Sequence, residues 1–168
     1  ASAGFPISQR SKSTGSTMTG MRWCIGASLS FASVVTIVKV SSGSPALGVG
    51  VGNAVITVDD TADLDAAAEK IRLSKTLDLA ASCSSDNSGG LLDGIYEPML
   101  EKLKAQGGYL CNEDEKAALR NTLWDEELHL NTAIVAQPPE KIAQMAGLNI
   151  PEETQFFIVS EAGWGPEH

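Results

Sequence analysis

The alternation of short apolar runs with amphipathic segments, from residue 54 onward, constrains this fold most strongly. The run AVITV at 54–58 is rich in β-branched residues and has the composition of a strand inside a parallel sheet. The segment 61–76 follows, with apolar residues on one helical stripe, acids in its first turn and bases in its last. Such alternation predicts an α/β domain built in layers around a mostly parallel sheet.

Further elements are expected on both sides of this pair. Ile95, Met99 and Leu103 recur at helical spacing and predict a helix that ends at Gly107 and Gly108. The other expected elements are a strand at 33–40, a helix from the capping box of Asn112 and Glu115 to Trp124, a strand at 131–137, a helix opened by Pro138 and Pro139 with Ile142, Met145 and Ala146 on one side, and a strand at 156–159.

Charge is distributed unevenly along the chain. The first acidic residue is Asp59, so all 21 acids follow it, whereas the first 58 residues carry only bases. Such a break typically marks a boundary, which we place near Ser41, separating a segment 1–40 from a domain 41–168. The net charge of −9 argues against nucleic acid and anionic membrane surfaces as partners, since both require clustered bases.

The uncharged segment 23–38 raises the alternative of a targeting or membrane segment. It reads WCIGASLSFASVVTIV, and a glycine and several serines interrupt it. A membrane span requires about 20 mostly apolar residues, and a secretory signal lies at the start of a chain. We therefore favour a role inside a soluble protein.

The cysteine pattern does not predict a disulfide framework or a metal site. Cys24, Cys83 and Cys111 are odd in number, lack metal-ligand spacing and have no histidine cluster beside them. We therefore expect a reduced, cytoplasmic setting in which at least one thiol is free to react.

Cys83 is the candidate nucleophile. It lies within SCSSDNS, among small polar residues after the helical segment 61–76, where backbone N–H groups can approach a thiolate and an oxyanion. Spacing alone favours the alternative of an inert, half-buried cysteine. A Cys/His hydrolase that uses His129 is a weaker possibility, because nothing near His129 supports it.

Gly48 and Gly50 belong to a glycine-rich run that offers a candidate contact with a cofactor phosphate. The run lacks the GxGxxG register, and a strand follows it where a phosphate-binding loop would open a helix. A tight strand connection is the favoured interpretation of these residues.

Beyond these patterns, the sequence resembles the aldehyde dehydrogenase superfamily. The resemblance rests on SSGSPALGVGVGN at 41–53 and VDDTADLDAAAEKIRLSKTLDLAASCSSDNS at 58–88, and it continues through NTAIVAQPPEKIAQMAGLNIPEETQFFIV. These stretches are most similar to the CoA-acylating branch, including acylating sulfoacetaldehyde dehydrogenases and the aldehyde half of bifunctional aldehyde-alcohol dehydrogenases. The resemblance implies a three-layer catalytic domain that is incomplete at its C-terminus, with 1–40 a poorly matched remnant of the cofactor domain.

The resemblance also implies a chemistry. Cys83 matches the catalytic thiol, which forms a thiohemiacetal with an aldehyde and passes hydride to NAD or NADP. Ala46 stands where hydrolytic members carry a glutamate that activates water, which implies coenzyme A as acyl acceptor. A small aldehyde and coenzyme A are the expected ligands, and the full-length parent is expected to form a homo-oligomer.

Two departures from the family qualify this interpretation. Gly89 and Gly90 stand where the family tends to have apolar strand residues, so we expect a weakened strand after Cys83. The nicotinamide-binding half and the asparagine of the oxyanion hole lie upstream in the family. A degenerate, noncatalytic fragment that serves as a structural or assembly module is therefore the alternative function.

Overall fold

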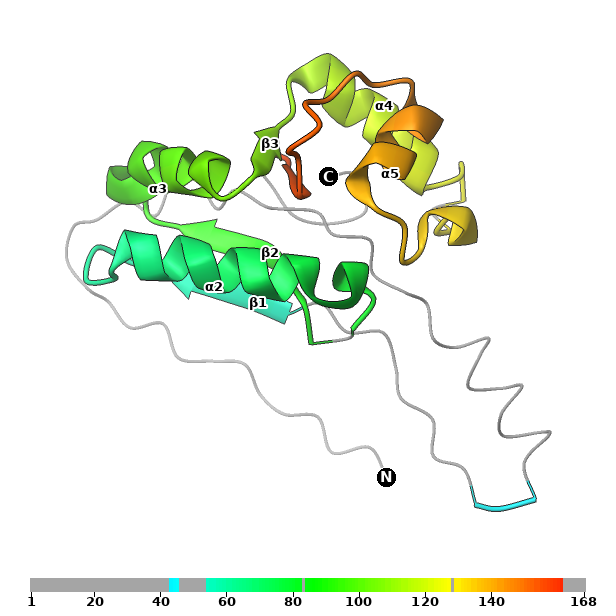
Figure 1. Cartoon of the computed structure of the whole chain (residues 1–168), viewed down its shortest axis with the longest axis horizontal. Coiled ribbons are helices and arrows are strands. Elements are labelled where there is room, and N and C mark those ends of the chain that lie inside the picture. Colours follow the sequence, from blue (N-terminus) through cyan, green and yellow to red (C-terminus); the bar gives the residue numbers. More distant parts are fainter. Residues whose placement is uncertain (1–42, 46–53, 83, 128, 162–168) are drawn as a thin grey trace.

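Helices and strands alternate through the part of the chain that the computed structural model describes, residues 43–45, 54–82, 84–127 and 129–161 (Figure 1). This confirms the predicted α/β class. In chain order the elements are β1 (Ala54–Val58), α2 (Leu64–Thr76), the 3-10 helix η1 (Leu77–Ala80), β2 (Asp86–Leu91), α3 (Asp93–Ala105), β3 (Gly108–Leu110), α4 (Glu113–Leu123), the 3-10 helix η2 (Thr132–Ile134), α5 (Pro139–Ala146) and β4 (Phe156–Ile158).

The strands form two pairs, and both pairs are parallel. β1 pairs with β2, so that Ala54 lies opposite Asp86 at one end and Val58 opposite Leu91 at the other. β3 pairs with β4 from Gly108 to Leu110. The predicted parallel arrangement is therefore confirmed for the described strands.

Helix α2 starts three residues later than the sequence pattern suggested. Asp59 accepts hydrogen bonds from the backbone N–H of Thr61 at 3.0 Å and from its hydroxyl at 2.6 Å, which fixes a turn before the helix. The helix then begins behind Asp63, whose carboxylate accepts hydrogen bonds from the N–H groups of Asp65 and Ala66. Hydrogen bonds to local side chains thus move the start of the helix to Leu64.

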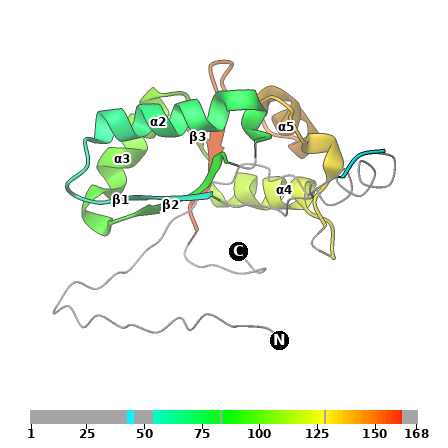
Figure 2. The ribbon, with the colours of Figure 1, turned by 90° about the horizontal axis from the view of Figure 1, so that it is seen from below.

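Helices α2 and α3 cover one face of the β1–β2 pair, as Figure 2 shows. Between the helices and the strands lies the first core cluster. Its buried members are Val58, Ala68, Ile71, Tyr96, Met99, Leu100, Leu103, Phe156 and Ile158. The predicted stripe of Met99 and Leu103 is confirmed as core, whereas Ile95 packs at its edge.

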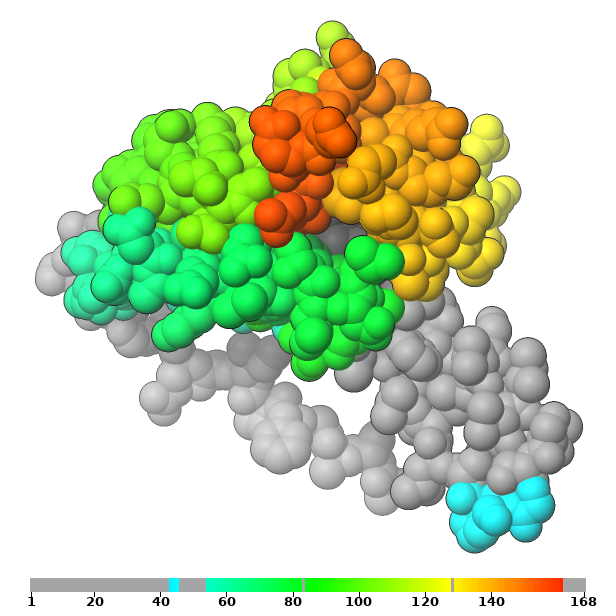
Figure 3. All heavy atoms as spheres, viewed as in Figure 1, coloured from blue at the N-terminus to red at the C-terminus, as the bar shows by residue number. Residues whose placement is uncertain are grey.

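A second core cluster joins α4, α5, η2 and β4. Its buried members are Cys111, Leu119, Leu123, Ile134, Ala143, Phe157 and Val159. β4 contributes to both clusters, because successive side chains of a strand point to opposite faces. Phe156 and Ile158 face the first cluster, and Phe157 faces the second. Figure 3 shows the segment around β4 lying between the surfaces of α3 and α5.

Of two expectations about residues 131–150, the strand was wrong and the helix face was right only in part. Residues 132–134 form a 3-10 helix instead of a strand, because the Asn131 side chain accepts a hydrogen bond from the N–H of Ala133 and so favours a local turn. On α5, Ile142 and Ala146 pack against the second core cluster as expected, whereas Met145 is exposed and Ala143 is the buried residue. The helix begins at Pro139 as expected, but its phase turns Ala143 inward.

The capping box that opens α4 is confirmed. The Asn112 side chain accepts a hydrogen bond from the N–H of Glu115 at 2.9 Å, and the Glu115 carboxylate accepts one from the N–H of Asn112 at 2.9 Å. The strand expected at 156–159 is observed as β4. β2 forms through Gly89 and Gly90 in register with β1, so these glycines do not prevent strand pairing.

Several expectations concern residues outside the described ranges, among them the strand at 33–40, the segment 23–38 and the boundary near Ser41. Within the described part of the chain, no helix is both long and apolar enough to cross a membrane.

Gly108 is required by close packing at the start of β3. A Cβ atom there would lie 2.6 Å from Cδ1 of Ile158 and 2.8 Å from the carbonyl oxygen of Leu103. We expect Gly108→Ala to lower the free energy of unfolding by about 1–3 kcal/mol, the usual cost of overpacking. Urea denaturation measures the change. Gly94→Ala is the matched control, because a Cβ atom at this position of α3 would meet nothing within 4 Å; an equal loss in both variants would contradict the packing argument.

Candidate functional site

The residues singled out by sequence, Cys83, Gly48, Gly50 and Ala46, lie outside the described ranges. The strands that follow them are described, however. β1 begins directly after the glycine-rich sequence 48–53, and β2 begins three residues after Cys83. Ala54 and Asp86 lie opposite each other in the β1–β2 ladder. The two motifs therefore lead into neighbouring strands at the same edge of the sheet.

The segment leading from α2 to Cys83 has an unusual backbone. Asp78, Leu79 and Ala80 have φ values of 51°, 52° and 58°, which place three consecutive non-glycine residues in the left-handed region. This conformation costs about 1–2 kcal/mol per residue for L-amino acids other than glycine. The N–H of Ala81 closes the turn by donating to the carbonyl oxygen of Asp78 at 2.9 Å.

Four backbone amides around Cys83 donate within the protein. Ala81 N–H bonds to Asp78, and Ser85 N–H bonds to the carbonyl oxygen of Ser82 at 3.1 Å. The N–H of Ser84 donates to the Ser82 hydroxyl at 3.4 Å, the longest of these contacts. The N–H of Asp86 donates to the hydroxyl of Ser74. Of these four donors, Ser84 N–H therefore makes the weakest hydrogen bond.

Two side-chain hydrogen bonds join the end of α2 to the start of β2, one residue apart on each element. The Ser74 hydroxyl accepts from the N–H of Asp86 at 2.9 Å. The Lys75 ammonium donates to Oδ1 of Asn87 at 3.0 Å, and both side chains are buried. We call these two bonds the α2–β2 clasp. The clasp closes the base of the segment that carries Cys83.

Sequence reasoning missed Lys75 and Asn87, although the α2 pattern holds a signal for the lysine. Leu64, Ala68 and Ile71 form the inward stripe of α2, and Lys75 continues that stripe at the next i+4 position. Its side chain is only 4% exposed. A lysine in phase with an apolar stripe is a candidate buried cation.

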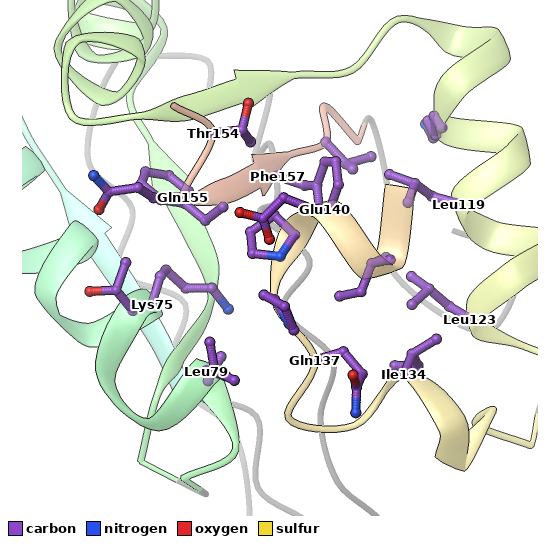
Figure 4. Close-up of a pocket in the computed structure, with 18 of the residues that line it drawn as sticks. Lys75, Leu79, Leu119, Leu123, Ile134, Gln137, Glu140, Thr154, Gln155 and Phe157 are labelled. Carbon is purple, nitrogen blue, oxygen red and sulfur yellow. The ribbon is translucent and has the colours of Figure 1, made fainter. Parts of the chain in front are cut away.

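A cavity of about 350 Å³ opens between η1, α4 and the start of α5 (Figure 4). Leu79 and Ala80 of the left-handed turn form one wall, together with Lys75. The opposite walls are mainly apolar and come from the second core cluster and its neighbours: Leu119, Leu123, Ile134, Ile142 and Phe157. The cavity is large enough for a small organic ligand.

The three cations that line the cavity in the described part of the chain, Lys75, Lys116 and Arg120, all interact with other groups of the protein. Lys116 lies 2.7 Å from the buried carboxylate of Glu161 and also donates to the carbonyl oxygen of Ser160 at 3.0 Å. Lys75 is held by Asn87. Among the described residues, this cavity therefore presents ion-paired and hydrogen-bonded charges rather than a ready phosphate cradle.

His129 lies on an exposed turn beyond α4, where its Nδ1 is 3.2 Å from Oδ2 of Asp125. The N–H of His129 donates a hydrogen bond to the carboxylate of Asp125 and is the main cause of its lowered pKa; the His129 side chain and the N–H of Glu127 add to the lowering. The acids at 125–127 are exposed to solvent. Asp125, Glu127 and His129 lie close enough together to contact one cation, but all three are exposed.

Comparisons with known proteins agree with the resemblance in the sequence. The bifunctional aldehyde-alcohol dehydrogenase of Escherichia coli K12 is 40% identical over 118 residues, which cover 70% of this chain and 13% of the relative. The acylating sulfoacetaldehyde dehydrogenase of Cupriavidus necator is 41% identical over 128 residues, which cover 75% of this chain and 26% of the relative. No family model matches the chain.

Solved structures give the same result for the fold. An acetylating aldehyde dehydrogenase from Geobacillus thermoglucosidasius superposes with a TM-score of 0.71 and 34% identity, over 80% of this chain and 29% of that protein. This chain is similar in sequence and fold to CoA-acylating aldehyde dehydrogenases. It spans about an eighth to a quarter of the length of the two curated relatives, so the similarity covers a part of each.

Cys111 is the cysteine that the structure places in the core. Burial raises the pKa of its thiol to about 12, and the negative charge of Glu115 adds to the shift. At pH 8 the thiolate fraction is then about 10⁻⁴. We expect iodoacetamide to leave Cys111 unmodified in the folded chain at pH 8 and to modify it in urea, as peptide mass spectrometry measures. Rapid modification without denaturant would contradict its burial.

Proposed function

We propose that this chain carries the nucleophile of an NAD(P)-dependent, CoA-acylating aldehyde dehydrogenase, and that Cys83 is this nucleophile. The proposal is supported by the similarity to acylating enzymes on both sides of SCSSDNS and by the paired starts of β1 and β2. The paired strand starts are the observation that carries it, because the two strands that follow the motifs of the resemblance begin side by side.

The reaction follows from the chemistry of a thiolate. The Cys83 thiolate adds to the aldehyde carbon and forms a thiohemiacetal, whose oxyanion backbone N–H groups stabilise. Loss of the aldehyde hydrogen as hydride leaves an acyl-thioester on Cys83. The thiolate of coenzyme A then attacks the thioester carbonyl, and the Cys83 thiolate leaves as acyl-CoA forms.

Ala46 accounts for the transfer of the acyl group to coenzyme A instead of water. An alanine has no carboxylate with which to activate water, so hydrolysis of the thioester is expected to be slow. A thiolate is a stronger nucleophile toward a thioester than neutral water. Transfer to coenzyme A is therefore the proposed outcome of each turnover.

The nicotinamide cofactor accepts the hydride when it is bound. The cations that line the cavity, Lys75, Lys116 and Arg120, all interact with other groups of the protein, so the cavity does not fit the pyrophosphate of NAD(P) or coenzyme A. We therefore propose that other parts of the protein bind these groups, and we assign Gly48 and Gly50 no more than a backbone contact. We place the full-length protein in the cytoplasm, because a free thiolate requires reducing surroundings. From the resemblance we also propose that the full-length protein forms a homo-oligomer.

The role of Cys83 can be tested in the full-length protein with aldehyde, coenzyme A and NAD⁺. We expect Cys83→Ser to reduce acyl-CoA formation at least about 10³-fold, because an unactivated hydroxyl is a poor nucleophile. Acyl-CoA is measured by mass spectrometry, and Cys111→Ser is the control, since that thiol is buried and neutral. Full activity of the Cys83 variant would exclude this mechanism.

A thiol titration separates the enzyme from the noncatalytic alternative. If Cys83 alkylates with an apparent pKa near that of a free thiol, about 8.5, the assembly-module function is favoured. An activated thiol titrates well below this value.

Ala46→Glu tests the acceptor. A carboxylate placed at this position is expected to activate water, and the ratio of free acid to acyl-CoA should rise about tenfold or more, within the range of general base catalysis. Both products are quantified by chromatography after a fixed time. Ala46→Gln is the matched control, because it has the same shape without a basic group; equal ratios in the two variants would refute the role of position 46.

A further inference from the structure

The α2–β2 clasp and the left-handed turn belong to one segment of the chain. Residues 77–85 leave α2 and return to β2, with Ser74–Asp86 and Lys75–Asn87 closing the segment at its base. The turn at 78–80 lies near the start of this segment, and Cys83 follows it. The described residues of this segment thus lie between two points at which α2 is hydrogen-bonded to β2.

A left-handed turn without glycine does not persist by local preference. Leucine and alanine disfavour this region because their Cβ atoms approach the backbone carbonyl oxygen too closely. Such conformations survive where surrounding contacts hold them, and they gather at functional sites. Ala80 is buried, and the clasp lies immediately before and after the segment.

Of the two clasp bonds, the one made by Lys75 is the more costly to lose. Its ammonium is charged and buried, so loss of the bond to Asn87 removes a contact that offsets desolvation. The Ser74–Asp86 bond is partly buried and involves a neutral hydroxyl. The Lys75–Asn87 bond is therefore the more sensitive support of the segment.

We propose that Lys75, bound to Asn87, is a positioning residue that holds the Cys83 segment in its reactive geometry. This inference rests on the proposed function of Cys83. Lys75 touches no reacting atom in the proposal and acts through the backbone of the segment. Because Lys75, Leu79 and Ala80 also share a wall of the cavity, relaxation of the turn would reshape that wall as well (Figure 4).

The test measures alkylation of Cys83 in this chain by iodoacetamide at several pH values, resolved by peptide mass spectrometry. We expect Lys75→Met to slow alkylation at pH 7.5 about tenfold, since small displacements of a reacting group have effects of this size or larger. Asn87→Leu should slow it similarly. Asn87→Asp keeps an oxygen acceptor for the Lys75 ammonium, so Cys83 in this variant should be alkylated at a rate near that of the wild type.

The other ionisable groups on the cavity walls are Lys116, Arg120, Glu140 and Glu161. Lys70→Met removes a positive charge from an exposed position of the same helix and controls for net charge. It should leave the Cys83 rate and its pH profile unchanged. Protection of Cys111 in every variant reports that the second core remains folded.

The double variant Lys75→Met with Asn87→Leu keeps the proposal testable if a single variant unfolds, because replacing both polar partners by apolar groups avoids an unsatisfied buried group. Its Cys83 rate should equal that of the single variants. A wild-type rate in a folded double variant would overturn the positioning role alone. Free-thiol reactivity of Cys83 in the wild type would instead overturn the proposed function, and the positioning role with it.

Discussion

Parallel pairing of β1 with β2 is the constraint from which the other features of the candidate site follow. Two parallel strands cannot be joined by a tight hairpin, so the chain must cross back along the sheet before the second strand begins. Here α2 makes that crossing, and its inward stripe supplies the first core cluster. The return to β2 then brings the Cys83 segment to the edge where β1 also begins.

β4 has a comparable role between the two halves of the described structure. Its three residues are all buried, and alternate side chains enter different clusters. A short strand of this kind couples the packing around α2 and α3 to the packing around α4 and α5. Gly108 lies opposite Phe156 in the β3–β4 ladder, and the packing there leaves no space for a Cβ atom.

The sequence predicted those elements whose signals are local and agree with their tertiary surroundings. The capping box of Asn112 and the stripe of α3 formed as expected, because side-chain spacing decides both. The segment after Asn131 was misassigned, since β-branched residues favour strands only where a partner strand is available. There the asparagine side chain bonded to nearby backbone and gave a 3-10 turn.

The candidate site was predictable only in part, for a physical reason. Motif similarity makes Cys83 the candidate nucleophile, but the residues proposed to support its segment can be recognised only from contacts across the fold. Lys75 and Asn87 are distant enough in sequence that no local pattern pairs them, and a lysine in a helix usually faces solvent. Only the packing of α2 against β2 reveals the bond.

The left-handed turn at 78–80 has a consequence for how the reactivity of this cysteine can be studied. A short synthetic peptide that contains LDLAASCSSDNS would spend little time in this turn, because its leucine and alanine residues prefer right-handed or extended backbone. Any unusual nucleophilicity of the thiol is then a property of the folded domain, absent from the isolated loop. Inhibitors selected against such a peptide would address a different molecular shape from the one the protein presents.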